Sequence, residues 1–474
     1  MDWDRREFVV LASTAPMFLP RATAAAAVLT PEAFGAKGDG KTNDTDAFAD
    51  LSAHINAARG GTVALRPVTY IVGKHLPPTA GEAGYAFTPS PVLHFVGCTA
   101  PVVVRGNGAV LRAQGGLRFG SFDPATGRPA ERGAKFYDAA FRASPYIAMI
   151  HAERCSGGIA VADLDLDGNS GGLQIGGQWG DVHWQLPGSG IFLVDNLGPE
   201  RLSNIRSHDH PLDGIIIDGP TQRAASSTVS NIVCDRNARQ GCSIVGGRNY
   251  AFDRCRFTRT GKARLLSAPS AGVDIEPGDK LVRNLSFTSC EFSDNSGAGM
   301  VADSGDSEGA TFHSCTFVGT SMWSAWPNKP GFRFSGCTFV GAMVHAYGSP
   351  DPQRAAQFAD CRFLDDPALS PTRIVYGGTG QGQPIAQLPD SSNARFERCD
   401  FDLTANAVLP WSTNEVIFAD CTMSQRSPVR SYPRGTYLGI TTIRGNAELA
   451  GSTIDGTVIL NGATLPRSNL RRTS

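Results

Sequence analysis

The hydrophobic positions in the second half of the chain follow a six-residue pattern in which Phe, Cys and Phe recur at fixed spacing. The pattern F-x-x-C-x-F occurs at 252–257, 287–292, 312–317, 334–339, 358–363 and 396–401, with degenerate copies around Cys234 and Cys421. Most intervals between successive cysteines are 22–25 residues, and the longer ones of 35 and 38 contain an insertion. A strand-like repeat of this period, without a long helical pattern, predicts a solenoid of β-strands.

The spacing inside each copy predicts how the side chains point. Cys and the following Phe are two residues apart, so they share one face of a strand, whereas the first Phe is three residues before Cys and requires a bend. Equivalent residues of neighbouring coils then stack about 4.8 Å apart. We therefore interpret most of the eleven cysteines as small apolar core residues, although stacked neighbours lie within reach of a disulfide.

Residues 30–73 have a different pattern, with a Gly-rich turn and then a helical stripe of Ala47, Phe48, Leu51 and Ile55. Such a helix can cover the open end of a solenoid. The stretch FGAKGDGKTNDTDAF…GGTVALRP…YIV resembles the N-terminal signature of the pectate lyase/polygalacturonase-like superfamily. The resemblance implies an all-β, single-stranded right-handed parallel β-helix over 26–474, with an N-terminal capping helix (cap 30–73, coils 90–460).

The resemblance also implies a carbohydrate-active protein, but it leaves the reaction open. The polygalacturonase motifs G-H-G and R-I-K and the pectate lyase motifs W-x-D-H and R-x-P-x-x-R do not occur in this sequence. Activity therefore has to be argued from the residues themselves.

The N-terminus has the order of an export signal. Arg5-Arg6 precedes a mildly apolar run to Leu19, and Ala22-Thr23-Ala24 offers a cleavage site. We predict a signal peptide over 1–25 of the twin-arginine type, with a general secretory signal as the alternative, and a periplasmic or extracellular protein. No later run approaches the ~20 apolar residues of a membrane span.

The overall charge is balanced, with 43 Lys and Arg against 44 Asp and Glu. It gives no reason to expect nucleic acid as a partner. Length alone would allow about three domains, but the repeat predicts one solenoid. We expect a monomer or a homotrimer.

Aligning the coils on the Gly that opens one strand sorts the residues into columns. Two inward columns hold Ile191, Ile215, Cys242, Val273 and Met300, and then Leu193, Ile217, Ile244, Ile275 and Ala302. The outward column beyond them holds Val194, Asp218, Val245, Glu276 and Asp303. Asp274 also points outward, and Asp213 lies at the corner before Gly214. We expect these carboxylates to meet on one exposed face.

Paired carboxylates at this spacing suit glycosidic bond cleavage. Inverting hydrolysis needs an acid and a base about 6.5–9.5 Å apart, and retaining hydrolysis about 5–5.5 Å. Residues i and i+2 of a strand are about 6.6 Å apart and adjacent coils about 4.8 Å. We predict Asp274 and Glu276 as acid and base, assisted by Asp218 and Asp213, with Asp303 binding substrate. The same acids suit Ca²⁺, and solvated surface charges are the third interpretation.

Imidazole and guanidinium groups flank this face. His208 and His210 enclose Asp209, and the alignment of His210 with Asn237 and Asn295 equally fits a structural ladder of turn residues. Arg239 and Arg248 lie on either side of a strand, where they can bind a sugar uronate or form structural ion pairs. We assign these four residues to substrate binding.

An insertion at 258–270 is expected to wall a groove beside Asp274, and Trp323 and Trp326 to stack on sugar rings, although Trp is also simply large and half-buried. We expect a secreted enzyme that cleaves a polysaccharide, favoured as a glycoside hydrolase that requires no cofactor. The alternatives are a lyase that eliminates across a uronate, with Arg239 or His210 as base and Ca²⁺ as a cofactor, and a non-catalytic glycan-binding β-helix.

Overall fold

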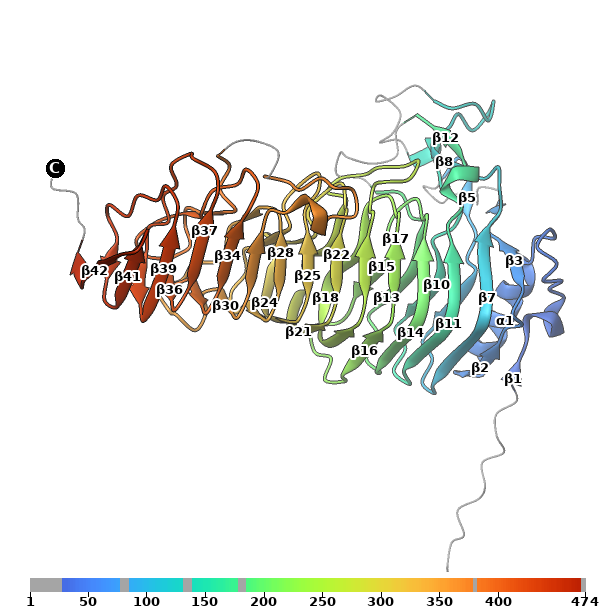
Figure 1. Ribbon diagram of the computed structural model, residues 1–474. Coiled ribbons are helices and arrows are strands. Elements are labelled where there is room, and N and C mark those ends of the chain that lie inside the picture. Colours follow the sequence, from blue (N-terminus) through green and yellow to red (C-terminus); the bar gives the residue numbers. More distant parts are fainter. Residues whose placement is uncertain (1–27, 77–84, 131–138, 178–184, 378–381, 470–474) are drawn as a thin grey trace, which may run out of the picture.

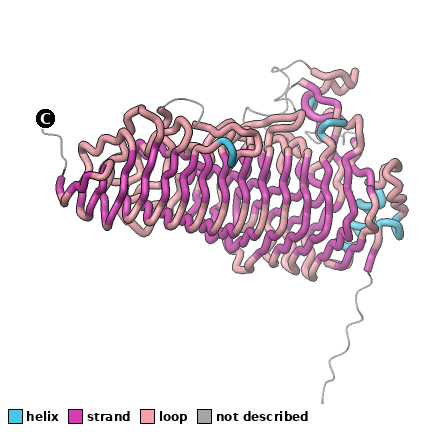
Figure 2. Tube along the Cα trace, in the orientation of Figure 1, coloured by secondary structure: helices cyan, strands magenta, loops and turns pink. Residues whose placement is uncertain are grey.

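The protein is a parallel β-helix in a computed structural model that describes residues 28–76, 85–130, 139–177, 185–377 and 382–469. Its coils stack along one axis, with the N-terminal helix at one end (Figure 1). Strands of successive coils lie side by side and the longer loops gather along one edge (Figure 2). The predicted signal peptide lies outside the described residues.

Each coil has up to three sides. The first side, which we call the groove sheet, consists of β6 (Leu93–Val96), β10 (Ala148–Glu153), β13 (Ser189–Val194), β15 (Ile215–Asp218), the start of β18 (Gln240–Asp253), β20 (Ala271–Ile275), β23 (Met300–Ala302) and β26 (Ala325–Pro327). All of these pairings are parallel and in register, apart from one bulge between β15 and β18.

The other two sides begin in strands that run around a corner: β7 (Val102–Ala113), β11 (Ile159–Asp167) and β14 (Glu200–His208). The second side continues in β16 (Ser227–Ser230), the end of β18, β21 (Leu281–Thr288), β24 (Asp306–His313), β27 (Arg333–Ser335), β30 (Gln357–Ala359), β33 (Arg395–Glu397), β36 (Ile417–Ala419), β38 (Thr436–Leu438) and β40 (Thr453–Ile454). The third continues in β17 (Val233–Asp235), β19 (Arg256–Thr258), β22 (Glu291–Ser293), β25 (Thr316–Val318), β28 (Thr338–Val340), β31 (Arg362–Leu364), β34 (Asp400–Leu403), β37 (Thr422–Gln425), β39 (Ile440–Arg444) and β41 (Thr457–Leu460).

Small sheets and short helices complete the fold. Three strands extend the coils after β26, namely β29 (Met343–Val344), β32 (Ala386–Leu388) and β35 (Trp411–Ser412). The loop side carries β4 (His75–Leu76) with β5 (Thr88–Pro89), and β8 (Arg118–Ser121) with β9 (Arg142–Ala143) and β12 (Gln174–Gly176). The 3-10 helices are η1 (Pro31–Phe34), η2 (Ala139–Phe141), η3 (Ser170–Gly172) and η4 (Pro367–Leu369). At the C-terminal end β42 (Ala463–Leu465) and β43 (Ser468–Asn469) pair antiparallel with β41 and β40.

The repeated pattern builds the core as predicted. The first Phe of each copy stacks on its equivalent in the next coil, as in Phe287 on Phe312 at 4.8 Å and 5°. The second Phe forms a parallel ladder, as in Phe292 on Phe317 at 4.6 Å. All eleven cysteines are buried and free, so the predicted stacking of thiols without disulfides is confirmed.

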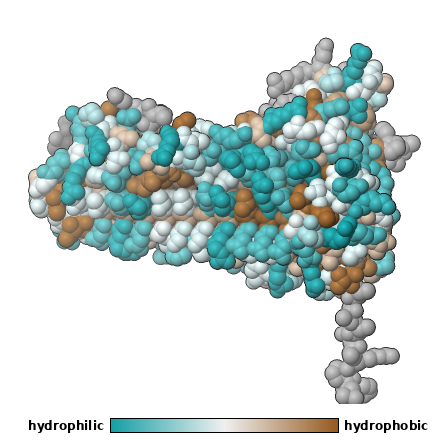
Figure 3. All heavy atoms as spheres, turned by 45° about the vertical axis from the view of Figure 1, so that its right-hand side comes forward, coloured by the Kyte–Doolittle hydropathy of each residue, from teal (hydrophilic) through white to brown (hydrophobic). Residues whose placement is uncertain are grey.

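The predicted bend lies at the residue before the Cys of each F-x-x-C-x-F copy. This residue adopts the left-handed conformation in successive coils, with φ of 51° at Arg254, 52° at Ser289 and 51° at Ser314. A single left-handed residue turns the chain sharply and flips the alternation of side chains, which accounts for the three-residue spacing. Because equivalent residues stack in register, apolar surface forms a narrow band along the axis (Figure 3).

Helix α1 (Thr45–Ala57) covers the N-terminal end and buries Phe48, Leu51 and Ile55. It also completes the open edge of β6. The Asn56 side chain donates to the carbonyl of His94 at 2.9 Å and accepts from the amide of Val96 at 2.9 Å, and the Ser52 hydroxyl accepts from the amide of His94 at 3.1 Å. An unpaired edge would otherwise be exposed to other chains. Strands β2 (Gly61–Ala64) and β3 (Thr69–Val72) already belong to the solenoid, because both pair with β7, and β1 (Val28–Leu29) pairs with β2.

Arg223 and Glu200 form an ion pair inside the solenoid. Arg223 and Glu200 are 0% and 1% exposed, and their side chains meet at 2.7 Å. Glu200 also accepts hydrogen bonds from Tyr250 at 2.5 Å and Asn196 at 2.9 Å. Such a pair is tolerated in the interior only because several donors satisfy the carboxylate.

Candidate functional site

The outer face of the groove sheet carries one continuous row of side chains. In-register pairing places in this row His94, His151, Phe192, Ile216, Ser243, Asp274, Val301 and Trp326. The row mixes apolar and polar side chains, and its single carboxyl group is that of Asp274. The inward columns predicted from the sequence have this same register, and their residues are buried.

A hollow of about 380 Å³ lies over the C-terminal half of this row. The side chains and loops that line it are Gln185, Ala268, Pro269, Ala271, Asp274, Glu276, Ala298, Val301, Asp303, Met322, Trp323 and Trp326. The predicted residues Asp274, Glu276, Asp303, Trp323 and Trp326 therefore come together. Ala268 and Pro269 belong to the insertion 258–270, which forms a wall of the hollow as expected.

Asp274 points outward as predicted, but it is only 5% exposed, because the walls of the hollow cover it. Burial, followed by the neighbouring charge of Glu276, raises the pKa of Asp274 to about 8. Arg239 opposes this shift without cancelling it. A carboxyl group with this pKa still carries its proton at pH 7 and can donate it.

Gln240 orients this carboxyl group. Its Nε2 donates to Oδ2 of Asp274 at 2.6 Å, and its Oε1 accepts from the backbone amide of Ala271 at 2.9 Å. The second bond fixes which end of the amide faces Asp274, because an amide N–H can only donate. Oδ2 is thus occupied as an acceptor, and the proton of Asp274 belongs on Oδ1. Sequence reasoning missed Gln240, and also Gln185 and Met322 in the walls.

Glu276 and Asp303 lie at the rim, and both are exposed. Glu276 accepts a hydrogen bond from the hydroxyl of Ser304 at 2.8 Å. The site thus combines one buried carboxyl group with two exposed ones, and such a difference in environment is what separate acid and base roles require.

Asp213 does not reach the hollow, which corrects its predicted position. It is fully buried, accepts from Nε of Arg239 at 2.8 Å and from the hydroxyl of Ser243 at 2.9 Å, and also pairs with Nη2 of Arg239. The structural ion pair considered for Arg239 is the one observed. Arg239 is therefore bound by Asp213 and is not free for a uronate.

Asp218 also lies outside the hollow. A bulge pairs it with Gly246 instead of Val245, so the predicted outward column is broken here. Lys280 binds it at 2.8 Å and binds Asp195 at 2.7 Å. Burial nevertheless raises the pKa of Asp218.

The two histidines have structural surroundings, His208 at the end of β14 and His210 in the turn before β15. His210 is fully buried, its Nδ1 lies 2.8 Å from the Tyr146 hydroxyl, and burial lowers its pKa to about 3. Its amide donates to Asn237 at 3.1 Å, which fits the ladder of turn residues. His208 lies between Asp165 at 2.8 Å and Asp209 at 2.6 Å. Neither lines the hollow, contrary to the predicted substrate contacts.

Arg248 is likewise misplaced in the prediction. It follows the corner at Gly246-Gly247 and pairs in register with Arg283 on the second side.

The two tryptophans, in contrast, form one wall of the hollow. Trp323 and Trp326 meet edge to face at 5.2 Å and 77°, and neither indole N–H has a hydrogen-bond partner among the described residues.

A second hollow, of about 320 Å³, lies further toward the N-terminus on the same face. Phe192 and Ile216 of the row form part of it, and Gln185 lines both hollows. The two hollows are therefore neighbours along the row, and an extended ligand can occupy both.

Comparison with known proteins confirms the class of fold. The family described as "Right handed beta helix region" matches residues 185–363, so the expected right-handed parallel β-helix is confirmed. No curated protein matches the chain. Among the described residues, no helix is long and apolar enough to cross a membrane.

Solved structures with a similar fold include proteins with different activities. The A-module of the mannuronan C-5 epimerase AlgE6 of Azotobacter vinelandii is 16% identical, with a TM-score of 0.46 over 91% of this chain and 98% of that one. The tailspike capsular polysaccharide depolymerase of Acinetobacter baumannii bacteriophage Fri1 is 13% identical (TM-score 0.44; 89% and 63% covered). An exopolygalacturonase of Thermotoga maritima is 13% identical (TM-score 0.35; 93% and 94% covered). At this identity they share the fold alone.

Proposed function

We propose that this protein is an exported glycoside hydrolase that cleaves a polysaccharide bound along the groove sheet. The observation that carries the proposal is the buried carboxyl of Asp274, with its raised pKa, facing a hollow whose rim holds the exposed carboxyl groups of Glu276 and Asp303.

Asp274 is proposed as the general acid. It gives the proton on Oδ1 to the glycosidic oxygen while the bond from that oxygen to the anomeric carbon breaks. Gln240 keeps the other oxygen as an acceptor, so that the proton faces the hollow. The low exposure of Asp274 keeps the group protonated until the leaving oxygen needs the proton.

Glu276 is proposed as the second carboxylate, two residues further along the same strand direction. Residues i and i+2 of a strand are about 6.6 Å apart, and this spacing from Asp274 suits a base that takes a proton from the attacking water. Water then adds its oxygen to the anomeric carbon, and the proton returned to Asp274 closes the cycle. The configuration of the first product, followed by NMR, decides whether the reaction inverts or retains.

The lining favours hydrolysis over elimination. Elimination across a uronate needs a positive group to neutralise the sugar carboxylate and a base for its neighbouring proton. Among the described residues that line the hollow there is no Arg, Lys or His. Arg239 lies nearby, but Asp213 binds it. We therefore propose a neutral sugar at the cleavage position, with Trp323 and Trp326 as the apolar platform for its ring.

Substitution of the two carboxyls tests this proposal. Asp274→Asn and Glu276→Gln should each abolish turnover of a responsive polysaccharide with the fold intact, whereas Asp279→Asn, an exposed acid outside the hollow, should not. Hydrolysis releases reducing ends, and elimination releases an unsaturated sugar that absorbs in the ultraviolet. Full activity of a variant that carries both Asp274→Asn and Glu276→Gln would refute the site. Binding without turnover across a broad panel would favour a non-catalytic role.

The proposed reaction requires no cofactor, so activity should survive a Ca²⁺-selective chelator. Loss of activity with the chelator and its recovery on adding Ca²⁺ would instead place the ion among the rim carboxylates.

Export is tested by cell fractionation, in which replacing both Arg5 and Arg6 by Lys should retain the protein in the cytoplasm.

A further inference from the structure

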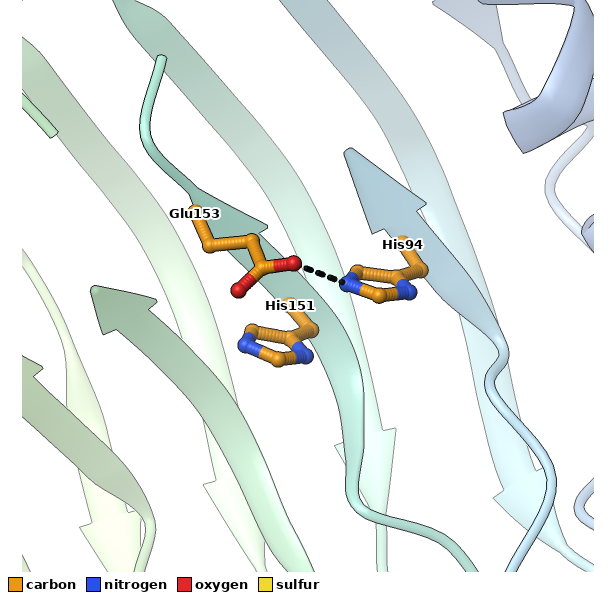
Figure 4. Close-up of side chains that lie close together, drawn as sticks. All are labelled: His94, His151 and Glu153. Atoms are coloured by element: carbon orange, nitrogen blue, oxygen red, sulfur yellow. Dashed lines mark ion pairs between the residues drawn. The ribbon is translucent and has the colours of Figure 1, made fainter. Parts of the chain in front are cut away.

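A second cluster of polar side chains lies on the same outer face, at the end next to α1. His94 of β6 and His151 of β10 are partners in register, and Glu153 follows two residues after His151. The imidazole rings stack at 4.4 Å and 6°, and Oε1 of Glu153 lies 3.4 Å from Nε2 of His94. Figure 4 shows the carboxylate beside the nitrogen-bearing edges of both rings. The proposed hydrolysis uses none of these groups.

The two ring nitrogens lack the partners that buried nitrogens normally have. Nε2 of His94 and Nε2 of His151 are shielded from solvent, and neither makes a hydrogen bond in the described structure. A buried polar atom without a partner is unfavourable.

We propose that His94, His151 and Glu153 bind a divalent transition-metal ion, with Zn²⁺ as the reference ion. One donor atom from each residue lies within 4.8 Å of the others. Two imidazoles and a carboxylate form a common donor set for zinc and leave a fourth position open. Imidazole nitrogen also distinguishes this site from a calcium site, which would use oxygen ligands alone.

Binding requires a small, defined rearrangement. Donors around one tetrahedral zinc lie roughly 3.3 Å apart, given bonds of about 2.0–2.1 Å. The lone pair of an imidazole lies in the ring plane, so the two parallel rings must tilt toward each other. Glu153 must share its carboxylate with Arg154, which binds it at 2.9 and 3.0 Å. Arg154 is 60% exposed, so this pair is weak and its rearrangement has a small energetic cost.

The backbone around the cluster is already fixed. Ser52 and Asn56 of α1 hold the edge of β6, and Phe192 stacks on the outer face of His151 at 5.1 Å. A rigid frame of this kind lets side-chain rotation alone complete the site. The ion would then join β6 to β10 at the N-terminal end of the groove sheet.

The experiment is a titration of the chelator-treated full chain with Zn²⁺, followed by calorimetry and by thermal unfolding. One equivalent should bind and raise the melting temperature. His151→Phe keeps a ring stacked between His94 and Phe192 but removes a ligand, and Glu153→Gln removes the charged donor. Each should weaken binding at least about tenfold, since even outer-shell changes cost 10–100-fold. His313→Ala, at an exposed histidine elsewhere, should bind like the unaltered chain.

Two results would overturn the site: no stoichiometric binding to the unaltered chain, or equal binding by His151→Phe. Circular dichroism of each variant establishes that it is folded before it is titrated. Because the readout is metal binding and not turnover, the result is independent of the hydrolysis proposed for Asp274.

Discussion

Gln240 donates a hydrogen bond to Oδ2 of Asp274 across two neighbouring coils, at 2.6 Å. Its other end is held by a backbone amide, so the direction of this bond is fixed by the fold. The bond decides which oxygen of the acid can carry the proton. The residue that orients the acid thus comes from the preceding coil, 34 positions earlier in the sequence.

Replacing Gln240 by Leu should lower kcat with little change in KM. The change removes the donor to Asp274 and leaves the amide of Ala271 without its acceptor, so the carboxyl can rotate away from the productive position. A loss of about 1.4 kcal/mol of transition-state stabilisation corresponds to about a tenfold slower reaction. Steady-state kinetics measures both constants. A pure increase in KM would show that Gln240 contacts the substrate instead.

The pKa of Asp274 predicts that activity and stability both fall as pH rises. Activity should fall as pH rises through about 8, because the acid loses its proton. The folded pKa lies above the ordinary value of 3.8, so the folded state binds the extra proton and stability also falls as pH rises from about 4 to about 8. Asp274→Asn should abolish most activity yet unfold at a higher denaturant concentration than the unaltered protein at pH 9. Equal stability of the two at pH 9 would contradict the raised pKa.

Trp326 should contribute to binding of the glycan. Its ring occupies the same outward row as Asp274 and forms a wall of the hollow with Trp323. Trp326→Ala should raise KM roughly tenfold, as expected for loss of about 1–1.5 kcal/mol of ring stacking. Trp411→Ala is the matched control, because Trp411 is 45% exposed and lies outside the hollow. If the two variants behaved alike, the stacking role would be wrong.

The interior ion pair predicts a large loss of stability on breaking it. Arg223→Ala would leave Glu200 buried without its cation, at an expected loss of about 3–5 kcal/mol in the free energy of unfolding. Arg256→Ala, which breaks an exposed pair with Glu291, should change it by about 0–1 kcal/mol. Denaturant unfolding of both variants measures the difference. A small effect of Arg223→Ala would mean that water reaches Glu200 in the coil.

His208 predicts a stability that decreases in alkali. Burial alone would lower its pKa, but the hydrogen bonds that the ring donates to Asp165 and Asp209 raise the pKa to about 9. Because the folded pKa is the higher one, this stabilisation is complete below pH 6.5 and is lost as pH rises through about 9. The free energy of unfolding should therefore drop between pH 6 and pH 9.5, and His208→Gln should remove that part of the drop. If the free energy of unfolding of His208→Gln followed the same pH profile as that of the unaltered protein, His208 would not be charged in the folded state.

The sequence predicted the columns of the solenoid because alternation and repetition are local properties. Val273, Ile275 and their equivalents point inward by period alone, and Asp274 and Glu276 point outward for the same reason. The fates of the other acids depended on distant partners. Asp213 meets Arg239, and Asp218 meets Lys280 after a bulge that shifts the register. No local pattern encodes such a bulge or shows which exposed acid an insertion will bury.

The number of coils sets the length of the outer face of the groove sheet, because its row of side chains is in register from coil to coil. From His94 to Trp326 the row crosses strands β6, β10, β13, β15, β18, β20, β23 and β26, or about 34 Å at about 4.8 Å per step. Each coil adds an identical increment to this face. Adding or deleting one whole coil would change the reach of the face by one increment and leave the chemistry at Asp274 in place.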